Sequence, residues 1–346
     1  MTKLLLSLLF FLTLPASAFA TEITAPEVPR MGSEQMPQNL ESFDEALREL
    51  MENSRNLFQP EMENALEIGS CILLIIMLFS LLSMLTKRIQ PILSISGAAS
   101  VAVVMFQHTN LLILYASNAV QEICEYGKLL CPVLTMALAA QGAVSASTAL
   151  YTGTTMFISV LSILVSRIML PMVYLFLIFS ISNCAFGDGI MKNLSSTVKQ
   201  IMTWLLKTML IVFITYMSIT GVVSGTTDAA ALKATKVTIS SVVPVVGGIL
   251  SDASESILVS MGIIKNSVGI YGIFAVLAVF MGPFIKIGTQ YLVLKITAMV
   301  CTIFGTKNLS ALIDDFSSAM GLLLAMVAAG SLLILISTVC FMKGIG

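Results

Sequence analysis

From Leu66 onward, long apolar runs alternate along the chain with short polar stretches. A transmembrane helix needs about 20 mostly apolar residues, because the hydrocarbon core of a bilayer is about 30 Å thick. The pattern therefore predicts an all-α, polytopic transmembrane helical protein whose membrane domain covers residues 66–346. The candidate spans are 66–86, 91–107, 129–147, 151–186, 200–223, 268–286, 288–304 and 319–342.

The run 151–186 is too long for one straight span. Its apolar core, Thr155 to Cys184, would extend about 45 Å as a single helix, and Arg167 and Pro171 interrupt it. Length favours two short spans, and one kinked, tilted helix is the alternative. The Lys and Arg counts in the resulting loops are equal for both topologies, so the positive-inside rule does not decide between them.

Two amphipathic stretches, 111–127 and 226–241, lie between the candidate spans. One side of the first is apolar, and the other carries Asn118, Gln121 and Glu122. A helix of this kind lies in the plane of the membrane interface. We therefore expect both stretches to connect spans rather than to cross the bilayer.

The first twenty residues have the pattern of a secretory signal peptide. Lys3 is followed by an apolar core, and Ala18-Phe19-Ala20 matches a signal-peptidase cleavage site. An uncleaved first membrane helix is the alternative, but the core is short for a span. We expect residues 1–20 to be removed and the chain from Thr21 to begin outside the cytoplasm.

Residues 21–65 are predicted to form an extracytoplasmic acidic linker and an amphipathic helix. Prolines in 22–39 indicate a flexible linker. Ser42 and Glu45 have the spacing of a capping box, so a helix starts at Ser42. Apolar residues then recur at helical spacing until Pro60, which is expected to end the helix. The apolar stripe either packs on the membrane domain or bilayer, or it docks a partner outside the cytoplasm.

Arg167, Lys207 and Lys295 fall within apolar runs. Charge at membrane depth is costly and usually faces a bundle interior or water. We expect Lys207 to extend to the lipid headgroups, and Arg167 is a candidate for a structural or pathway role. The possible acidic partners are Asp188, Asp228, Asp252, Glu255, Asp314 and Asp315.

Residues 242–256, which read VVPVVGGILSDASES, predict a broken or re-entrant element that leads into a helix. Proline removes an amide donor, and the two glycines allow backbone angles closed to other residues. Such breaks recur at transporter and channel sites, and an ordinary surface loop is the alternative. The candidate structural or pathway residues of this segment are Pro244, Gly247, Gly248, Asp252 and Glu255, with Asp252 and Glu255 in capping positions.

The composition excludes several classes of function. Hydrophobic residues make up 57% of the chain and charged residues 11%, against about 25% charged in soluble domains. No basic run indicates nucleic-acid binding.

The six cysteines form no CxxC pair and there is one histidine, so we expect no metal and no cofactor. No phosphate-binding motif is present, and Phe186-Gly-Asp-Gly189 lacks the second membrane aspartate of an aspartyl protease. We expect no enzymatic activity.

The order of these features resembles the stage III sporulation protein AE family of endospore-forming bacteria. The specific motifs are Trp204-Leu-Leu-Lys-Thr208 leading to Gly221, Pro244-Val-Val-Gly-Gly248 with Asp252, and Gly282-Pro-Phe-Ile-Lys286. The resemblance covers nearly the whole chain after the signal, although the acidic tail is short for that family.

The resemblance implies a non-enzymatic membrane subunit of the channel complex that joins mother cell and forespore. It implies a location in the mother-cell membrane that surrounds the forespore. The implied partners are the other stage III sporulation A-operon proteins and stage II sporulation protein Q, besides membrane lipid. A stand-alone transporter or permease, with a small solute bound near Pro244 to Asp252, is the alternative function.

Overall fold

The computed structural model describes residues 25–40, 42–85, 90–187, 189–242, 247–303 and 307–343, without the side chains at 83–85, 90, 91, 94, 221–242, 247–261 and 264. This part of the chain is helical and contains no strand, so the predicted all-α fold class is confirmed. The α-helices are α2 (Phe43–Leu85), α3 (Gln90–Ala140), α4 (Val144–Ile163), α5 (Leu170–Phe186), α6 (Gly189–Val242), α7 (Gly247–Ile303) and α8 (Lys307–Lys343). A 3-10 turn, η2, covers Arg30–Gly32, and a π-helical turn, η4, covers Leu164–Met169.

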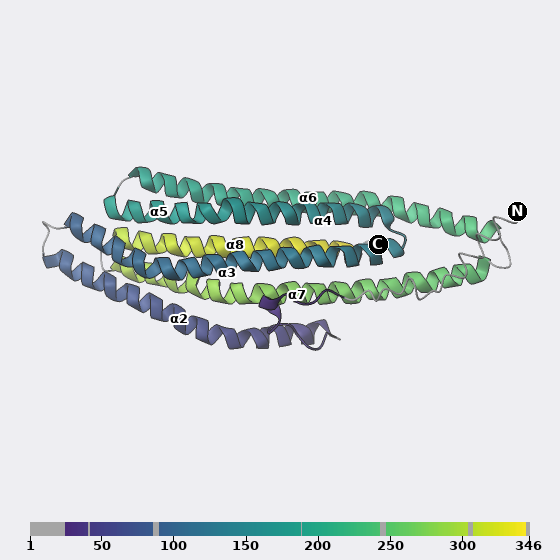
Figure 1. The fold of residues 1–346 in the computed structure, drawn as a ribbon, viewed down its shortest axis with the longest axis horizontal. Coiled ribbons are helices and arrows are strands. Elements are labelled where there is room, and N and C mark those ends of the chain that lie inside the picture. The colour runs from purple at the N-terminus through teal and green to yellow at the C-terminus, as the bar shows by residue number, and fades with distance from the viewer. Residues whose placement is uncertain are drawn as a thin grey trace.

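The helices lie side by side in one elongated bundle (Figure 1). The ends of α2, α5 and α7 and the starts of α3, α6 and α8 lie at one end of the bundle, and the ends of α3 and α6 and the starts of α4 and α7 lie towards the other. Gly142 (φ 92°) and Gly187 (φ 67°) end α3 and α5 in the left-handed conformation, which glycine adopts without a Cβ clash. Helix α8 runs through the centre, and its fully buried side chains include Phe316, Met320, Leu323, Met326, Val327 and Phe341.

Six segments are long and apolar enough to cross a membrane, which identifies a multi-pass membrane protein. They are Phe43–Leu82, Ile95–Ala140, Val144–Phe186, Gly189–Thr220, Lys265–Ile303 and Lys307–Lys343. The sequence pattern predicts eight or nine spans, so it divides some of these helices in error.

The preference for two spans in 151–186 is wrong. Helices α4 and α5 continue into one another through η4, and the residues at both junctions are right-handed helical. Pro171 lies in the first turn of α5, directly after the π-helical turn. An irregular turn of this kind accommodates the backbone hydrogen bond that proline cannot donate. The run therefore forms one long crossing, which was the alternative.

The separate spans 91–107 and 129–147 and the interfacial helix 111–127 are also wrong. The first span, the interfacial helix and the second span as far as Ala140 form one continuous helix, α3, and the rest of the second span contains the turn to α4 and the start of α4. The apolar face of 111–127 is buried in the bundle, with Ile113 and Val120 each 1% exposed and Ile123 fully buried. Packing against neighbouring helices, rather than a membrane surface, covers this face. The stretch 226–241 likewise belongs to α6 rather than to a separate helix.

The division between 268–286 and 288–304 is wrong for a similar reason. Helix α7 is continuous through Pro283 to Ile303. Lys286, which lies at the predicted boundary, forms an ion pair with Glu61 of α2, and the two side chains are 37% and 22% exposed. A charge that is paired with a neighbouring helix does not require its own helix to leave the membrane.

The N-terminal segment differs from the prediction in two respects. Residues 25–40 are not a free linker, because Gly32 is buried so closely against α7 that a Cβ there would lie 2.7 Å from the Val279 backbone nitrogen. Helix α2 starts directly after Ser42, as predicted, but it continues through Pro60. Helix α2 packs on α7 both before the proline, where the centre of the Phe43 ring lies 5.1 Å from that of the Phe274 ring, and after it, at Gly69. This packing holds the helix together although the proline lacks a backbone donor.

Candidate functional site: polar clusters inside the helix bundle

A polar cluster joins α2, α3 and α7. Lys286 of α7 forms an ion pair with Glu61 of α2, with 3.0 Å between Nζ and Oε1. The same ammonium lies 5.3 Å from the centre of the Tyr115 ring on α3, within the range of a cation–π interaction. One lysine therefore contacts both other helices. We call Glu61, Tyr115, Lys286, His108 and Gln290 the α2–α3–α7 cluster.

The remaining members of this cluster lie one to two turns further along the helices. His108 of α3 lies close to the Gln290 side chain on α7. Gln290 is 2% exposed, and its Nε2 has no hydrogen-bond partner within the described part of the chain. The buried hydroxyls of Thr109 and Tyr126 also have no hydrogen-bond partner within the described part of the chain. Groups of this kind are points at which water or a polar solute binds.

The glycine that begins the motif Gly282-Pro-Phe-Ile-Lys286 lies where a side chain would not fit. A Cβ at residue 282 would lie 2.7 Å from the Tyr115 hydroxyl oxygen. The glycine therefore lets the tyrosine lie directly against the α7 backbone, one turn from Lys286. The motif thus positions both the cation and the ring that it contacts.

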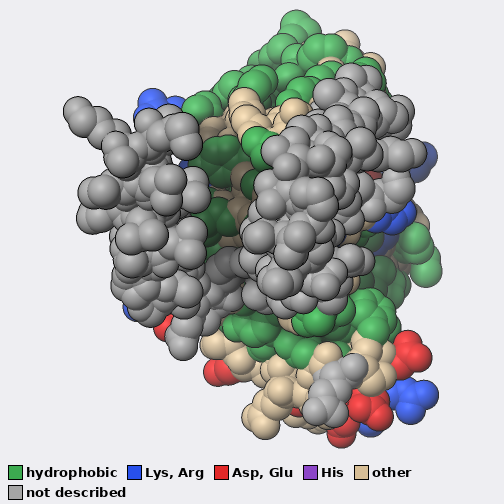
Figure 2. Space-filling model, turned by 90° about the vertical axis from the view of Figure 1, so that its right-hand side faces the viewer, with side chains coloured by type: hydrophobic (Ala, Val, Ile, Leu, Met, Phe, Trp, Pro, Cys, Tyr) green, Lys and Arg blue, Asp and Glu red, His purple; other side chains and the backbone are tan. Residues whose placement is uncertain are grey.

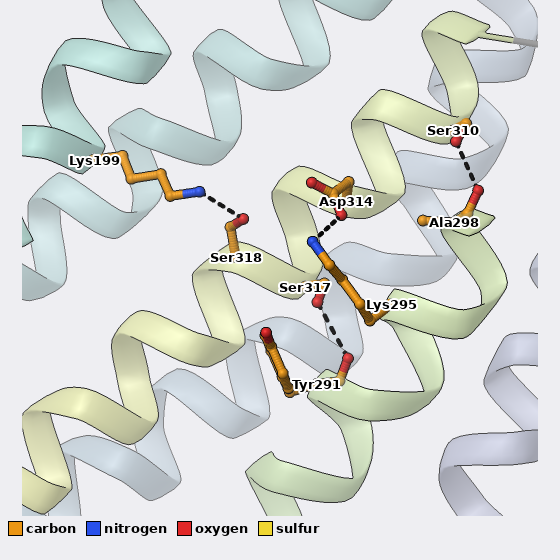
Figure 3. Close-up of polar contacts among 8 residues, drawn as sticks. All are labelled: Lys199, Tyr291, Lys295, Ala298, Ser310, Asp314, Ser317 and Ser318. Atoms are coloured by element: carbon orange, nitrogen blue, oxygen red, sulfur yellow. Dashed lines mark hydrogen bonds and ion pairs between the residues drawn. The ribbon is translucent and has the colours of Figure 1, made fainter. Parts of the chain in front are cut away.

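A second polar cluster joins α7 and α8, and Figure 3 shows its contacts. Lys295 of α7 pairs with Asp314 of α8. The hydroxyl of Ser317 donates to the Tyr291 carbonyl over 3.1 Å, and that of Ser310 donates to the Ala298 carbonyl over 2.7 Å. These contacts connect α7 and α8 over several helical turns. We call this group the α7–α8 cluster.

Contacts with α5 and α6 extend the α7–α8 cluster. Lys199 of α6 donates to the Ser318 hydroxyl over 2.8 Å (Figure 3). Ser180 of α5 and Ser195 of α6 are hydrogen-bonded over 2.9 Å, and Asp315 of α8 lies within reach of Ser180. The four helices are therefore joined by polar groups near the end of the bundle that carries the α5–α6 and α7–α8 turns.

Arg167 is exposed in η4, and the described residues offer it no ion pair or hydrogen bond. It therefore does not face the bundle interior within this chain. Lys207 is also exposed, in agreement with an outward orientation. Of the acidic partners proposed for Lys295, Asp314 is confirmed.

In the segment 242–256, residues 243–246 lie outside the described part of the chain, and no side chain of the segment is described. Helix α6 ends at Val242 and α7 begins at Gly247, and Pro244 falls in the gap between them. Asp252 lies five residues inside α7, so the helix does not start there as predicted. The side chains of Asp252 and Glu255 are not described, and a pathway role for Pro244, Gly247, Gly248, Asp252 and Glu255 stays a prediction.

Sequence reasoning missed most of the α2–α3–α7 cluster. Glu61 and Lys286 are far apart in sequence, and Tyr115 was assigned to an interfacial helix. One signal was available. His108, Tyr115 and Glu122 recur at intervals of seven, which places them on one face of a helix. Glu122 indeed accepts a hydrogen bond of 3.0 Å from the Met31 amide.

Comparison with known proteins gives the following matches. The sequence model of the family described as Stage III sporulation protein AE (spore_III_AE) matches residues 33–344. The curated Stage III sporulation protein AE of Bacillus subtilis (strain 168) is 23% identical over 223 residues, which cover 64% of this chain and 56% of that relative. The match thus spans little more than half the length of the relative. No solved structure matches the chain.

Proposed function

The chain belongs to the stage III sporulation protein AE family, and on this premise we propose that it is a non-enzymatic membrane subunit of the channel complex that joins mother cell and forespore. Family membership supports a role in sporulation. The observation that carries the proposal is the extent of the family match, which begins in the N-terminal segment and includes all six candidate spans. The family match therefore covers the whole bundle and not a single short motif.

The polar groups inside the bundle fit a subunit of this kind. Lys286, Glu61, Lys295 and Asp314 are engaged in pairs that connect different helices. Such pairs fix the relative positions of helices that lipid alone would not hold together. The proposed role of both clusters is to hold the bundle in one arrangement within a larger assembly.

The proposed orientation, with the N-terminal segment outside the cytoplasm, follows from the signal-peptide pattern of residues 1–20. Basic residues occur at both ends of the bundle, so their distribution does not add to this argument. Six crossings then place the end of α5 and the start of α8 on the cytoplasmic side. The opposite end, with the start of α4, then faces the intermembrane space in the proposed mother-cell membrane around the forespore.

The outer face of α2 is the proposed contact surface for partners on that side. Acidic and basic side chains gather at the lower edge of the face in Figure 2, where α2 begins. Exposed residues there include Asp44, Glu45, Arg48, Glu52 and Arg55. A hollow of about 640 Å³ on the same helix is lined by Glu52, Arg55, Asn56, Phe58, Gln59, Pro60 and Glu63. A polar, hollowed face of this kind favours a protein partner over lipid.

Co-purification from sporulating cells tests the proposal. We expect the tagged chain, extracted in mild detergent, to bring down the other stage III sporulation A-operon proteins and stage II sporulation protein Q. The charge reversals Glu45→Lys and Glu52→Lys are expected to lower the recovery of the extracytoplasmic partner several-fold, because they invert the charge of the contact surface.

Lys192→Glu is the matched control, since it reverses an exposed charge at the other end of the bundle. It is expected to leave recovery unchanged. Purification of the chain free of these proteins, under conditions in which they co-purify with one another, would contradict the proposal.

A further inference from the structure

The outer side of α6 carries a hollow of about 430 Å³. Its lining residues all belong to α6 and are Ser196, Lys199, Gln200, Thr203, Trp204 and Lys207. No other described helix contributes to it, so the hollow opens away from the bundle towards whatever surrounds it. For a membrane helix of this length the surroundings are lipid.

The hollow is positively charged. Lys199 and Lys207 are both exposed and lie about 12 Å apart along the helix, on the same side. Lys199 donates to the uncharged Ser318 hydroxyl, and Asp315 is near enough to act on it electrostatically. Lys207 has no acidic partner within the described residues. The site therefore keeps a net positive charge.

The same side of α6 becomes apolar directly beyond the lysines. Trp204 is 61% exposed, and Ile211 and Ile214, one and two turns past Lys207, are 63% and 46% exposed. No charged residue occurs from Thr208 to Thr220. Tryptophan next to such a change from cationic to apolar surface is typical of the level of the lipid headgroups.

We propose that the α6 hollow binds an anionic phospholipid. The lysine ammonium groups of Lys199 and Lys207 bind the headgroup phosphate, and one acyl chain lies along Ile211 and Ile214. Trp204 packs at the junction between headgroup and chain. The ligand is a lipid rather than free phosphate, because only a lipid fills both the cationic and the apolar part of this surface.

Trp204 is the chain's only tryptophan, so its fluorescence reports on this site alone. The test uses the full-length chain in phosphatidylcholine vesicles that contain a small fraction of phosphatidylglycerol. Bromine atoms, which quench tryptophan on close approach, are carried on the acyl chains of one lipid class at a time. We expect stronger quenching by brominated phosphatidylglycerol than by the same fraction of brominated phosphatidylcholine.

Each of the substitutions Lys199→Gln and Lys207→Gln is expected to weaken the preference for the anionic lipid about fivefold. Lys192→Gln, on the same helix but outside the hollow, is the matched control and should leave the preference unchanged. Inorganic phosphate added to the buffer should not displace the lipid. Equal quenching by the two lipids, or a preference that survives both Lys199→Gln and Lys207→Gln, would overturn the proposal. Displacement by inorganic phosphate would also overturn it, because the site would then bind phosphate rather than lipid.

Discussion

Deletion of this gene is expected to abolish heat-resistant spores almost completely while growth before sporulation stays normal. The reason is that the proposed subunit of a channel between mother cell and forespore would have no task in dividing cells, and its loss would stop development around or after engulfment. The measurement is the count of heat-resistant colonies against total colonies in parent and deletion strains. The proposed function predicts an effect of several orders of magnitude, the largest of any expected here.

A complementing copy of the gene supplies the control for this result. The unaltered copy should restore the spore count, and the Gly288→Ala copy should restore it equally, because a Cβ at that position meets no neighbouring atom. A deletion strain with the parental spore count would contradict the proposed function. Slow growth before sporulation would contradict the restriction of that function to development.

Gly153→Val is expected to destabilise the bundle by about 1–3 kcal/mol, the usual cost of overpacking a core. A Cβ at residue 153 would overlap the Tyr216 ring. That ring cannot easily move, because its hydroxyl donates to the Ala149 carbonyl over 3.1 Å and the Phe157 ring packs against it with 5.8 Å between ring centroids. Helix α6 would have to separate from α4. The measurement is thermal unfolding of the purified protein in detergent.

Gly288→Ala is the matched control for this substitution as well. Both glycines lie inside long helices, but only residue 153 has a close neighbour. Alanine has a higher helix propensity than glycine by up to about 1 kcal/mol, so Gly288→Ala should be neutral or stabilising. Equal stability of Gly153→Val and the unaltered protein would show that α4 and α6 do not pack as described.

The sequence predicted the fold class because lipid imposes a strong and simple requirement. Apolar runs of membrane length can be recognised in a sequence without any knowledge of tertiary contacts. All six candidate spans contain such a run. The divisions between runs were less predictable. Lys286 and Pro171 resemble the ends of helices, but the first is paired with Glu61 and the second follows a π-helical turn. Neither the ion pair of Lys286 nor the π-helical turn before Pro171 can be recognised from the neighbouring residues in the sequence.

The candidate site was predictable only where its partners are close in sequence. Lys295 and Asp314 lie on helices that follow one another in the sequence, α7 and α8, and the pair was among those expected. Glu61 and Lys286 meet only because α2 packs along α7, which the predicted break at Pro60 concealed. A residue pair of this kind becomes visible once the order of the helices in the bundle is known.

Cysteine labelling from each side of the membrane tests the six-crossing bundle most directly. Single cysteines at Val144, Lys192, Asn308 and Lys343, all exposed at or near the ends of helices, would be introduced into a chain without its native cysteines. Six crossings predict that Lys192→Cys and Asn308→Cys react from one side, and that Val144→Cys and Lys343→Cys react from the other. Reaction of Lys192→Cys and Asn308→Cys from opposite sides would mean that α6 and α7 do not each cross the membrane once, and would contradict the described fold.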